Sequence, residues 1–350
     1  MNILHLNPEL NIACGVSRVI FQITSHKHPE LNHSVLCFGG DGINKFSEKN
    51  LNVQVLKRKN IIQSYLYHIF KIIMFCKKNN IEVIHSHHRY FDFLTYFISK
   101  FISVRTIMTV HSKAYDKKFL SYFSDKFIAV SETINKHLQI NFGIDKKKII
   151  VINNYVTNEN IAFTNKEILL RQLNIKKGNL IVTYIGRFDK EKGVDILLKS
   201  IAKMKIKNVH FLFVGSGEER EFINSQVKRN NLPVTIVNSS RRIADYYMLS
   251  DIIILPSRVD SFPLVMVECG YFKKAFIGSE VDGIKEFIRN GIDGILFELE
   301  DFEGLTKSII YLYENEKIRT KLSENLNKKV MSHYLFKDNF DKYLKLYQYP

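Results

Sequence analysis

Short apolar runs alternate with amphipathic stretches along the whole chain, which predicts strands and helices in regular succession. In the first half, the runs rich in β-branched residues are NILHL, SVLCF, VQVL, VIHSH, RTIMTVH, KFIAVS and IIVINN. Apolar residues at helical spacing fall between these runs, at residues 16–25, 61–79, 91–101 and 131–140. Strands that alternate with helices are typical of parallel sheets with helices on both faces.

The pattern pauses at the polar, turn-rich residues 151–165 and then starts again. The strand candidates of the second half are IVTYIG, HFLFVGSG, VTIVN, DIIILPS, AFIGS and GILFE. A length of 350 residues suits two domains of this kind. We therefore expect an α/β fold of two doubly wound, Rossmann-like domains, residues 1–160 and 165–333, facing each other across a cleft. The aromatic, amphipathic segment 334–350 is expected to pack back on the first domain.

The composition is that of a soluble globular protein, with 45% apolar and 25% charged residues. We expect no transmembrane helix, because no uninterrupted apolar run approaches about 18 residues. The segment MNILHLNPEL has the pattern of a buried strand and lacks the features of a signal peptide. The cysteines at positions 14, 37, 76 and 269 show no CxxC spacing. Free thiols in a reducing cytoplasm are the simplest interpretation.

The formal net charge of +16 is the unusual bulk property. Residues 1–165 carry 21 Lys and Arg against 11 Asp and Glu, and the remainder carries 30 against 24. A basic first half favours an anionic membrane surface, a polyanion or phosphorylated substrates, although Lys-rich solubility charge gives the same count. A nucleic-acid-binding protein is one rival interpretation. Because the basic residues are not interleaved with a recognised nucleic-acid-binding module, we expect no nucleic-acid partner.

The segment YIGRFDKEKG, residues 184–193, joins a β-branched run to a helical pattern. It places Arg187 and Lys192 at the carboxyl end of a strand, where ligands bind in open α/β sheets. Two cations next to a helix amino terminus suit a multiply charged anion such as a diphosphate. The alternative is a solvated loop without a ligand.

Further motifs resemble the retaining glycosyltransferases of family 4, which have the GT-B fold. PSRVDSFPLVMVECG, residues 256–270, is similar to the family element in which two acids are separated by seven residues, here Asp260 and Glu268. The same order of motifs continues over nearly the whole chain: CGVSRVI, TVHS, AVSETI, VINNYV, GRFDKEKG, VGSGEE and GIKEFIRNGIDGILF.

This resemblance implies roles for individual residues. Arg187 and Lys192 would bind the donor diphosphate, and Glu268 would bind the ribose hydroxyls. Asp260 stands where the family usually has Glu, and it would hold hydroxyls of the donor sugar. His111 would touch that sugar near the reacting carbon.

The remaining implied contacts come from backbone and glycine positions. Gly15 would lie near the diphosphate and the acceptor, and Gly215, in VGSGEER, would line the nucleotide cleft. Pro263 replaces a frequent family glycine and starts the predicted helix without an N–H. Phosphate contacts there would fall to the amides of Leu264 and Val265.

Metal and dinucleotide sites are weaker interpretations. In HSHH, residues 85–88, alternation along a strand directs His85 and His87 to one face, but no acidic or cysteine companion is evident. We therefore expect no metal there and place His87 near the acceptor. The sequence has no Asp-x-Asp, which fits a donor site without a divalent ion, and we expect no other cofactor. VGSGEER lacks the third glycine of a nicotinamide-binding loop.

The sequence thus predicts a retaining glycosyltransferase that moves a sugar from a nucleotide-sugar donor to a glycan or lipid-linked acceptor. Bacterial surface polysaccharide synthesis, such as that of lipopolysaccharide, O-antigen or capsule, would provide such acceptors. The helix at 61–79 is expected to be mostly core, while its flanking basic residues dock on the inner face of the cytoplasmic membrane: Lys57, Arg58, Lys59, Lys77 and Lys78. A GT-B epimerase or sugar phosphorylase is the second rival.

Overall fold

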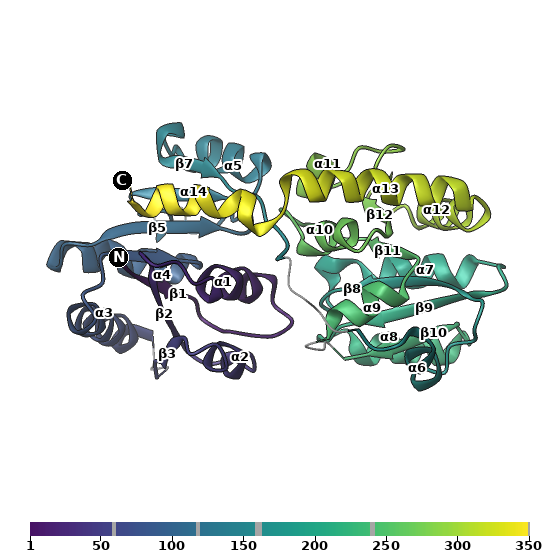
Figure 1. The fold of residues 1–350 in the computed structure, drawn as a ribbon, viewed down its shortest axis with the longest axis horizontal. Coiled ribbons are helices and arrows are strands. Elements are labelled where there is room, and N and C mark those ends of the chain that lie inside the picture. The colour runs from purple at the N-terminus through teal and green to yellow at the C-terminus, as the bar shows by residue number, and fades with distance from the viewer. Residues whose placement is uncertain (58–60, 117–119, 158–162, 239–241, 349–350) are drawn as a thin grey trace. The chain divides into compact units, whose positions relative to one another are not determined.

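The computed structural model describes residues 1–57, 61–116, 120–157, 163–238 and 242–348 (Figure 1). The chain divides into two compact units. Unit 1 comprises Met1–Asn153 and Asn339–Pro350, and unit 2 comprises Asn154–Asp338. Part of the expected linker, residues 158–162, and Arg58 and Lys59 lie outside the described residues.

Unit 1 is built on a parallel sheet with the strand order β3-β2-β1-β4-β5-β6-β7 (Figure 1). Its strands are β1 (Asn2–Leu6), β2 (Asn32–Cys37), β3 (Asn52–Val55), β4 (Val83–Ser86), β5 (Arg105–Val110), β6 (Lys126–Ala129) and β7 (Ile149–Val151). Its helices are α1 (Gly15–Ser25), α2 (Ile43–Ser47), α3 (Ile61–Lys78), α4 (Arg89–Phe101) and α5 (Glu132–Phe142), with a 3₁₀ turn η2 at Lys146–Lys148. The last helix, α14 (Phe336–Gln348), lies mostly in this unit.

Unit 2 repeats the arrangement in a parallel sheet with the order β10-β9-β8-β11-β12-β13. Its strands are β8 (Leu180–Ile185), β9 (Val209–Val214), β10 (Val234–Val237), β11 (Ile252–Leu255), β12 (Ala275–Ser279) and β13 (Ile295–Phe297). Its helices are α6 (Lys166–Gln172), α7 (Val194–Lys203), α8 (Arg220–Arg229), α9 (Ile243–Leu249), α10 (Leu264–Tyr271), α11 (Asp282–Phe287), α12 (Phe302–Glu314) and α13 (Glu316–His333), with a 3₁₀ turn η3 at Lys190–Lys192.

The central strands are buried on both faces, which explains why they appear in the sequence as continuous apolar runs. In β11, for example, all four residues are buried. Both sheets are parallel and alternate with helices, so the predicted α/β fold of two doubly wound units is confirmed. Every strand proposed from the sequence corresponds to a strand of the structure, with ends that differ by a few residues at most.

The expectation that the helix at 61–79 is mostly core is wrong for one face of α3. Leu66, Phe70 and Met74 follow one another at intervals of four residues and are 72%, 59% and 51% exposed. The opposite face, which includes Ile72 and Cys76, is buried against the sheet. Apolar composition alone did not separate these faces, because both carry large apolar side chains. Among the described residues, no helix combines the length and hydropathy that a membrane span requires.

Candidate functional site

Each sheet has one place where the strand order reverses, which in open α/β sheets is where ligands bind. In unit 2 this place lies between β8 and β11, and in unit 1 it lies between β1 and β4. The candidate residues of the sequence follow the carboxyl ends of these strands or of their neighbours. We call the two places the switch point of unit 1 and the switch point of unit 2.

The loop after β8 holds both predicted cations in an ordered turn. The buried Tyr184 hydroxyl donates to the carbonyl of Arg187 at 2.5 Å, and Asp189 Oδ1 accepts from the backbone N–H of Lys192 at 3.0 Å. The Arg187 guanidinium is about half exposed and lies 3.1 Å from Asp189 and 3.3 Å from Glu191. The loop therefore presents Arg187 at the surface with carboxylate partners that a ligand anion can replace.

Lys192 and Asp260 lie together, which the sequence did not predict. Lys192 Nζ is 2.5 Å from Asp260 Oδ2, and the two side chains are only 19% and 11% exposed. Ser257 also donates to the same carboxylate oxygen, at 3.4 Å. Lys192 therefore already has an anionic partner, so its position next to a helix amino terminus does not by itself require a bound anion. The pair joins the loop after β8 to the loop after β11.

Glycines allow the strand ends of unit 2 to approach one another closely. A side chain at Gly215 would meet the carbonyl of Gly186 at 1.9 Å. Gly193 has a φ of 65°, and a side chain there would meet the carbonyl of Pro256 at 1.9 Å. Only glycine fits both positions, so these residues bring the loops after β8, β9 and β11 into one surface.

Arg258 was missed by the sequence reasoning. Its guanidinium binds Asp195 through two hydrogen bonds of 2.8 and 2.9 Å and binds Glu300 through bonds of 2.5 and 3.0 Å. It also donates to the carbonyl of Lys190 at 2.5 Å. Burial raises the pKa of the Asp195 carboxyl, but the Arg258 hydrogen bonds and charge bring that pKa below its usual value. Arg258 therefore fixes the start of α7 and the loop of Arg187 and Lys192.

Glu268 lies in α10 and is 5% exposed. Its Oε2 accepts a hydrogen bond of 2.7 Å from the Tyr247 hydroxyl of α9. The prediction that Pro263 is the first residue of this helix is wrong: Pro263 is the N-cap of α10, because its ψ of 133° is extended. Leu264 and Val265 therefore occupy the first two helical positions, where backbone N–H groups have no intrahelical partner.

In unit 1, the predicted residues lie at the carboxyl edge of the sheet. Gly15 is the first residue of α1, His87 directly follows β4 and is buried, and His111 directly follows β5. His87 Nδ1 lies 3.2 Å from His111 Nε2, and their rings stack with centroids 5.5 Å apart. The structure thus brings His87 and His111 into direct contact.

His5 of β1 joins this group, and sequence reasoning did not include it. The available signal in the sequence was a histidine between the apolar residues of a predicted strand, NILHL. His5 Nδ1 is 3.1 Å from His87 Nε2, and ring nitrogens of His5, His85 and His87 lie within 4.8 Å of one another. Three imidazoles at this spacing are a possible metal-ligand set, but His85 already has hydroxyl partners on both nitrogens, Tyr347 at 2.8 Å and Thr109 at 2.7 Å.

Burial keeps these imidazoles neutral. The pKa of His85 and that of His111 are both lowered to about 3, in each case chiefly by desolvation and at His85 also by the charge of neighbouring histidines. The pKa values of His5 and His87 are also well below the usual value, first because of burial and then because of each ring's histidine neighbours. The switch point of unit 1 is thus polar and uncharged, whereas that of unit 2 contains ion pairs.

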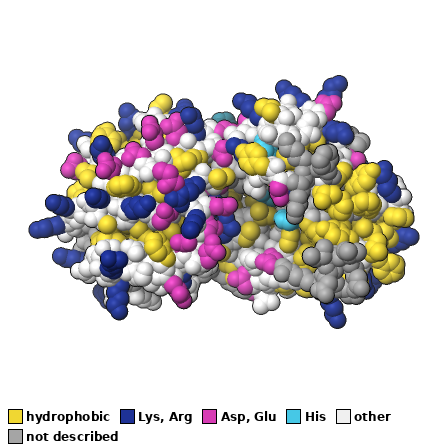
Figure 2. All heavy atoms as spheres, turned by 180° about the vertical axis from the view of Figure 1, so that it is seen from behind, with side chains coloured by type: hydrophobic (Ala, Val, Ile, Leu, Met, Phe, Trp, Pro, Cys, Tyr) yellow, Lys and Arg dark blue, Asp and Glu magenta, His cyan; other side chains and the backbone are white. Residues whose placement is uncertain are grey.

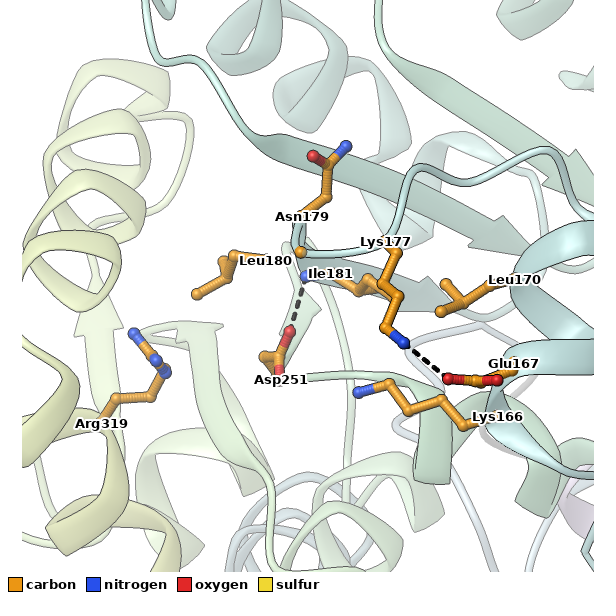
Figure 3. A pocket seen from close by; sticks show the side chains of 10 residues that line it. Lys166, Glu167, Leu170, Lys177, Asn179, Leu180, Ile181, Asp251 and Arg319 are labelled. Carbon is orange, nitrogen blue, oxygen red and sulfur yellow. Dashed lines mark hydrogen bonds and ion pairs between the residues drawn. The ribbon is translucent and has the colours of Figure 1, made fainter.

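A pocket of unit 2 lies at the other edge of the sheet (Figure 3). It borders the first residues of β8 and the residue before β11, and Lys177 pairs there with Glu167 at 2.7 Å. Asp251 accepts a hydrogen bond from the backbone of Ile181 at 2.7 Å, as the dashed line in Figure 3 shows. Because it lies at the amino ends of the strands, this pocket is separate from the switch point of unit 2.

Two family models match the chain. The model described as Glycosyl transferases group 1 matches residues 165–329, and the model described as Glycosyltransferase Family 4 matches residues 14–159. Together they extend over most of the chain, one over each unit.

Two curated relatives illustrate the similarity. A Campylobacter jejuni N,N'-diacetylbacillosaminyl-diphospho-undecaprenol alpha-1,3-N-acetylgalactosaminyltransferase is 29% identical over 61% of this chain and 57% of its own length. The Staphylococcus aureus capsular polysaccharide biosynthesis glycosyltransferase CapM is 26% identical over 56% of this chain and 54% of its own length. The chain therefore spans a little over half the length of these relatives.

Solved structures with the same fold match over nearly the full length. A glycosyltransferase from Rickettsia africae has a TM-score of 0.88 at 22% identity and covers 99% of this chain and 97% of its own. Anabaena HepE, crystallised with UDP-glucose, has a TM-score of 0.88 at 17% identity and covers 99% of both chains. These matches confirm that the fold belongs to the GT-B class.

Proposed function

Because the chain belongs to the group 1 glycosyltransferases, with the family 4 domain in its first half, we propose that it is a retaining glycosyltransferase with a nucleotide-sugar donor. Unit 2 would bind the donor, and unit 1 would bind the acceptor. The acceptor would be a glycan or a lipid-linked glycan of bacterial surface polysaccharide synthesis. The names of the relatives from Campylobacter and Staphylococcus support this acceptor class.

The observation that carries the proposal is the set of side chains at the switch point of unit 2. Arg187 and Lys192 offer two cations, Asp260 offers a carboxylate to which Lys192 is bound, and Glu268 offers a buried carboxylate four positions after the start of α10. Cations there would offset the negative charge that grows on the leaving nucleoside diphosphate. Carboxylates would accept hydrogen bonds from ribose and sugar hydroxyls.

The donor would enter by exchanging partners. A diphosphate would replace the carboxylates of Asp189 and Glu191 at Arg187 and would compete with Asp260 for Lys192. Asp260, once released from Lys192, would be able to accept from a sugar hydroxyl. The bound UDP-glucose of the structurally similar HepE makes uridine nucleotides the first donors to test.

Donor binding is tested by the melting temperature of the purified protein with UDP, GDP, ADP or CMP and with their common sugar conjugates. A ligand bound only by the folded state raises the melting temperature, by an amount that grows with its concentration. We expect one nucleotide series to raise it and the Arg187→Ala and Glu268→Ala variants to lose that rise. Lys177→Ala is the matched control, because Lys177 is an 81% exposed cation at the opposite edge of the same sheet (Figure 3).

The control distinguishes loss of the donor site from the loss of one positive charge anywhere on unit 2. If Lys177→Ala abolishes the rise as fully as Arg187→Ala does, the donor site has been placed wrongly. If no nucleotide series raises the melting temperature, and none is hydrolysed or transferred, the transferase proposal fails.

The donor would be held without a divalent ion, since Arg187 and Lys192 supply the positive charge. We expect the rise in melting temperature to survive an excess of EDTA. The configuration of the sugar would be retained by departure and attack on the same face. We favour this route because we identify no covalent nucleophile among the described side chains at the switch point of unit 2. A glycosyl-enzyme adduct trapped with a slow donor and seen by mass spectrometry would contradict this mechanism.

An exposed apolar face of unit 1 would dock on the membrane that contains a lipid-linked acceptor. Helices α3 and α4 pack together and expose large apolar side chains, which gather on this unit at the right of Figure 2: Leu66, Phe70, Met74, Tyr96, Phe97 and Phe101. Lys71 and Lys100 lie over the rings of Tyr67 and Tyr96 at 5.7 and 5.1 Å. Aromatic side chains next to lysines are typical of surfaces that insert at an anionic membrane interface.

Membrane docking is tested by sedimentation with vesicles of phosphatidylglycerol and phosphatidylcholine at low salt. We expect the double variant Phe70→Ser/Phe101→Ser to lose most of the binding. Ile140→Ser is the control, because Ile140 is 80% exposed on α5, away from the α3–α4 face. Absence of wild-type binding to anionic vesicles would refute docking and leave the donor proposal intact.

A further inference from the structure

Four histidines form a continuous row across the sheet of unit 1. His33 of β2, His5 of β1, His87 after β4 and His111 after β5 stand on neighbouring strands, in the order of the sheet. The contacts are 2.9 Å from His33 Nδ1 to His5 Nε2, 3.1 Å from His5 Nδ1 to His87 Nε2, and 3.2 Å from His87 Nδ1 to His111 Nε2. Each contact therefore joins Nδ1 of one ring to Nε2 of the next.

This head-to-tail order couples the protonation of the rings. A neutral imidazole has one N–H donor and one lone-pair acceptor. If His87 carries its proton on Nδ1, it donates to His111 Nε2, and its own Nε2 accepts from His5. The same rule then applies at His5 and His33. All four rings must share one tautomer, either Nδ1–H throughout or Nε2–H throughout.

The end of the row at His33 distinguishes these two states. His33 Nε2 is buried and has no hydrogen-bond partner among the described residues. In the Nε2–H state the row would end in a buried N–H without an acceptor, which is rare in folded proteins. In the Nδ1–H state it ends in an unused lone pair, which is tolerated more often. The structure therefore favours Nδ1–H on all four rings.

The other end of the row is His111. Within the part of the chain that the structure describes, its ring makes one hydrogen bond, the one to His87 through Nε2. With the proton on Nδ1, the lone pair of Nε2 is engaged by His87 and the Nδ1–H is left to donate. A ring in this state offers a hydrogen-bond donor and no lone pair for proton abstraction.

We propose that His33, His5 and His87 are positioning residues that hold His111 in the Nδ1–H tautomer, so that His111 donates a hydrogen bond to an acceptor oxygen of the substrate. This assignment of a ligand to His111 rests on the proposed transferase function, and the tautomer itself does not. The substrate group facing His111 is then a sugar hydroxyl oxygen or a carbonyl oxygen. His111 does not act as a general base.

A metal ion on His5, His85 and His87 is the competing use of the cluster. It would need lone pairs from His5 and His87 toward one ion, whereas their nitrogens are already at hydrogen-bonding distance from each other. It would also require His85 to give up Thr109 or Tyr347. Hydrogen bonds account for every nitrogen of these three rings without an ion.

The test is long-range ¹H–¹⁵N correlation NMR on the full chain labelled with ¹⁵N-histidine, at pH 7 and without substrate. The ring ¹⁵N shifts and couplings distinguish the two tautomers directly. We expect the resonances of His33, His5, His87 and His111 to show the Nδ1–H pattern, which is the minor form of free histidine. An Nε2–H pattern at His111 would overturn the proposal, and so would stoichiometric zinc in the purified protein that shifts the ring nitrogens of His5 and His87.

Two variants separate coupling through the row from general disruption of the cluster. His87→Phe removes the contact with His111, and we expect His111 to change to Nε2–H or to a mixture. His85→Phe removes a ring that stacks on His87 at 4.2 Å but lies outside the row, so His111 should stay Nδ1–H. An unchanged His111 in His87→Phe, with the backbone amides of unit 1 still native, would refute the positioning role. These readouts need no donor, so their failure is distinct from failure of the donor-binding test.

Discussion

The switch points of the two units are built on the same strand order but contain opposite chemistry. Unit 2 places the ion pair of Lys192 and Asp260 and the exposed Arg187 there. Unit 1 places a row of histidines there, of which His5 and His87 are buried. Ten of the 12 histidines of the chain lie in unit 1. One topology therefore supports a cluster of ion pairs in one unit and a row of neutral imidazoles in the other.

The two switch points avoid an unpaired buried charge in different ways. A charged ligand can enter unit 2 by replacing one partner of an existing ion pair, so no unpaired charge has to be buried in the unliganded protein. A neutral row of imidazoles in unit 1 avoids the cost of burying charge and directs hydrogen bonds instead. Each switch point can therefore be perturbed without changing the side chains of the other.

The largest effect is expected for Lys192→Ala. The substitution removes a cation from the proposed diphosphate site and leaves the Asp260 carboxylate without its lysine. Removal of one preorganised group that stabilises the transition state costs about 10²–10³ in kcat. We expect kcat to fall by about that factor in a transfer assay with the donor identified by melting temperature.

The matched control for Lys192 is Lys190→Ala. Lys190 belongs to the same 3₁₀ turn, and its side chain is exposed. It should change kcat by less than about threefold, as expected for a surface charge. Equal losses in the two variants would mean that the net charge of the loop matters and the position of Lys192 does not.

Acid should destabilise unit 1 before unit 2. Burial lowers the pKa of His85 to about 3, against about 6.5 in an unfolded chain. Between these values the unfolded chain binds a proton that the folded unit does not, so the free energy of unfolding falls as the pH falls from 6.5 toward 3. Each such ring contributes up to about 1.4 kcal/mol per pH unit. In unit 2 burial lowers the pKa of His210 as well, but this is one ring against the several buried rings of unit 1, and the lowered pKa of Asp195 acts only below the usual range of an aspartate.

Hydrogen exchange read by mass spectrometry measures both units in one experiment. Between pH 6.5 and 5, after correction for the intrinsic exchange rate, peptides of β4 should lose protection while peptides of β11 keep theirs. His85→Gln removes one titrating ring and should reduce the pH dependence in unit 1. An equal loss of protection in both units would contradict the assignment of acid sensitivity to the buried histidines of unit 1.

The fold was predictable because its strands are continuous apolar runs bounded by turns, and such a pattern depends only on local sequence. The sequence singled out the unit 2 candidates as individuals, because Arg187 and Lys192 follow a strand and Asp260 and Glu268 have the spacing of the family element; their role in donor binding stays a prediction. Their pairing was not predictable, because the contact of Lys192 with Asp260 crosses 68 residues and depends on strand order.

Arg258 and His5 were missed for the same reason. Arg258 is one basic residue in a basic chain, and only the folded structure places Asp195 and Glu300 on either side of it. His5 lies 82 residues from His87 and meets it only because β1 pairs with β4. The exposed face of α3 was missed because apolar content does not distinguish a helix buried all round from one with a free apolar face.

Arg258→Ala should weaken donor binding without abolishing it. Arg258 does not belong to the proposed ligand contacts but fixes the loop that contains them, through its hydrogen bonds to Asp195 and to the carbonyl of Lys190. Loss of hydrogen bonds to a charged group costs about 1.5–3 kcal/mol. We expect part of this to appear as a roughly tenfold rise in the Kd of the nucleotide, measured by calorimetry.

Arg258→Lys separates charge from geometry. Lysine keeps the positive charge but cannot form the two parallel bonds to Asp195. Its nucleotide Kd should lie between those of the wild type and Arg258→Ala. Full recovery by lysine would show that the charge alone positions the loop.

The most local effect is expected for Tyr247→Phe. The Tyr247 hydroxyl donates to the buried Glu268 carboxylate at 2.7 Å, and the ring stacks on Phe272 with centroids 5.0 Å apart. Phenylalanine keeps the stacking and removes the hydroxyl with its hydrogen bond to Glu268, so protection of the α10 amides from exchange should fall by about 1–2 kcal/mol. Tyr246→Phe is the control, because the described residues show no hydrogen bond to the Tyr246 hydroxyl.

If the two variants lose equal protection, the hydroxyl of Tyr247 does not stabilise Glu268, and the orientation of that carboxylate has to come from its other neighbours. If only Tyr247→Phe loses protection and also raises the nucleotide Kd, the unit 2 site depends on a hydrogen bond from an uncharged hydroxyl as well as on its ion pairs, and in its use of an uncharged donor it resembles the histidine row of unit 1.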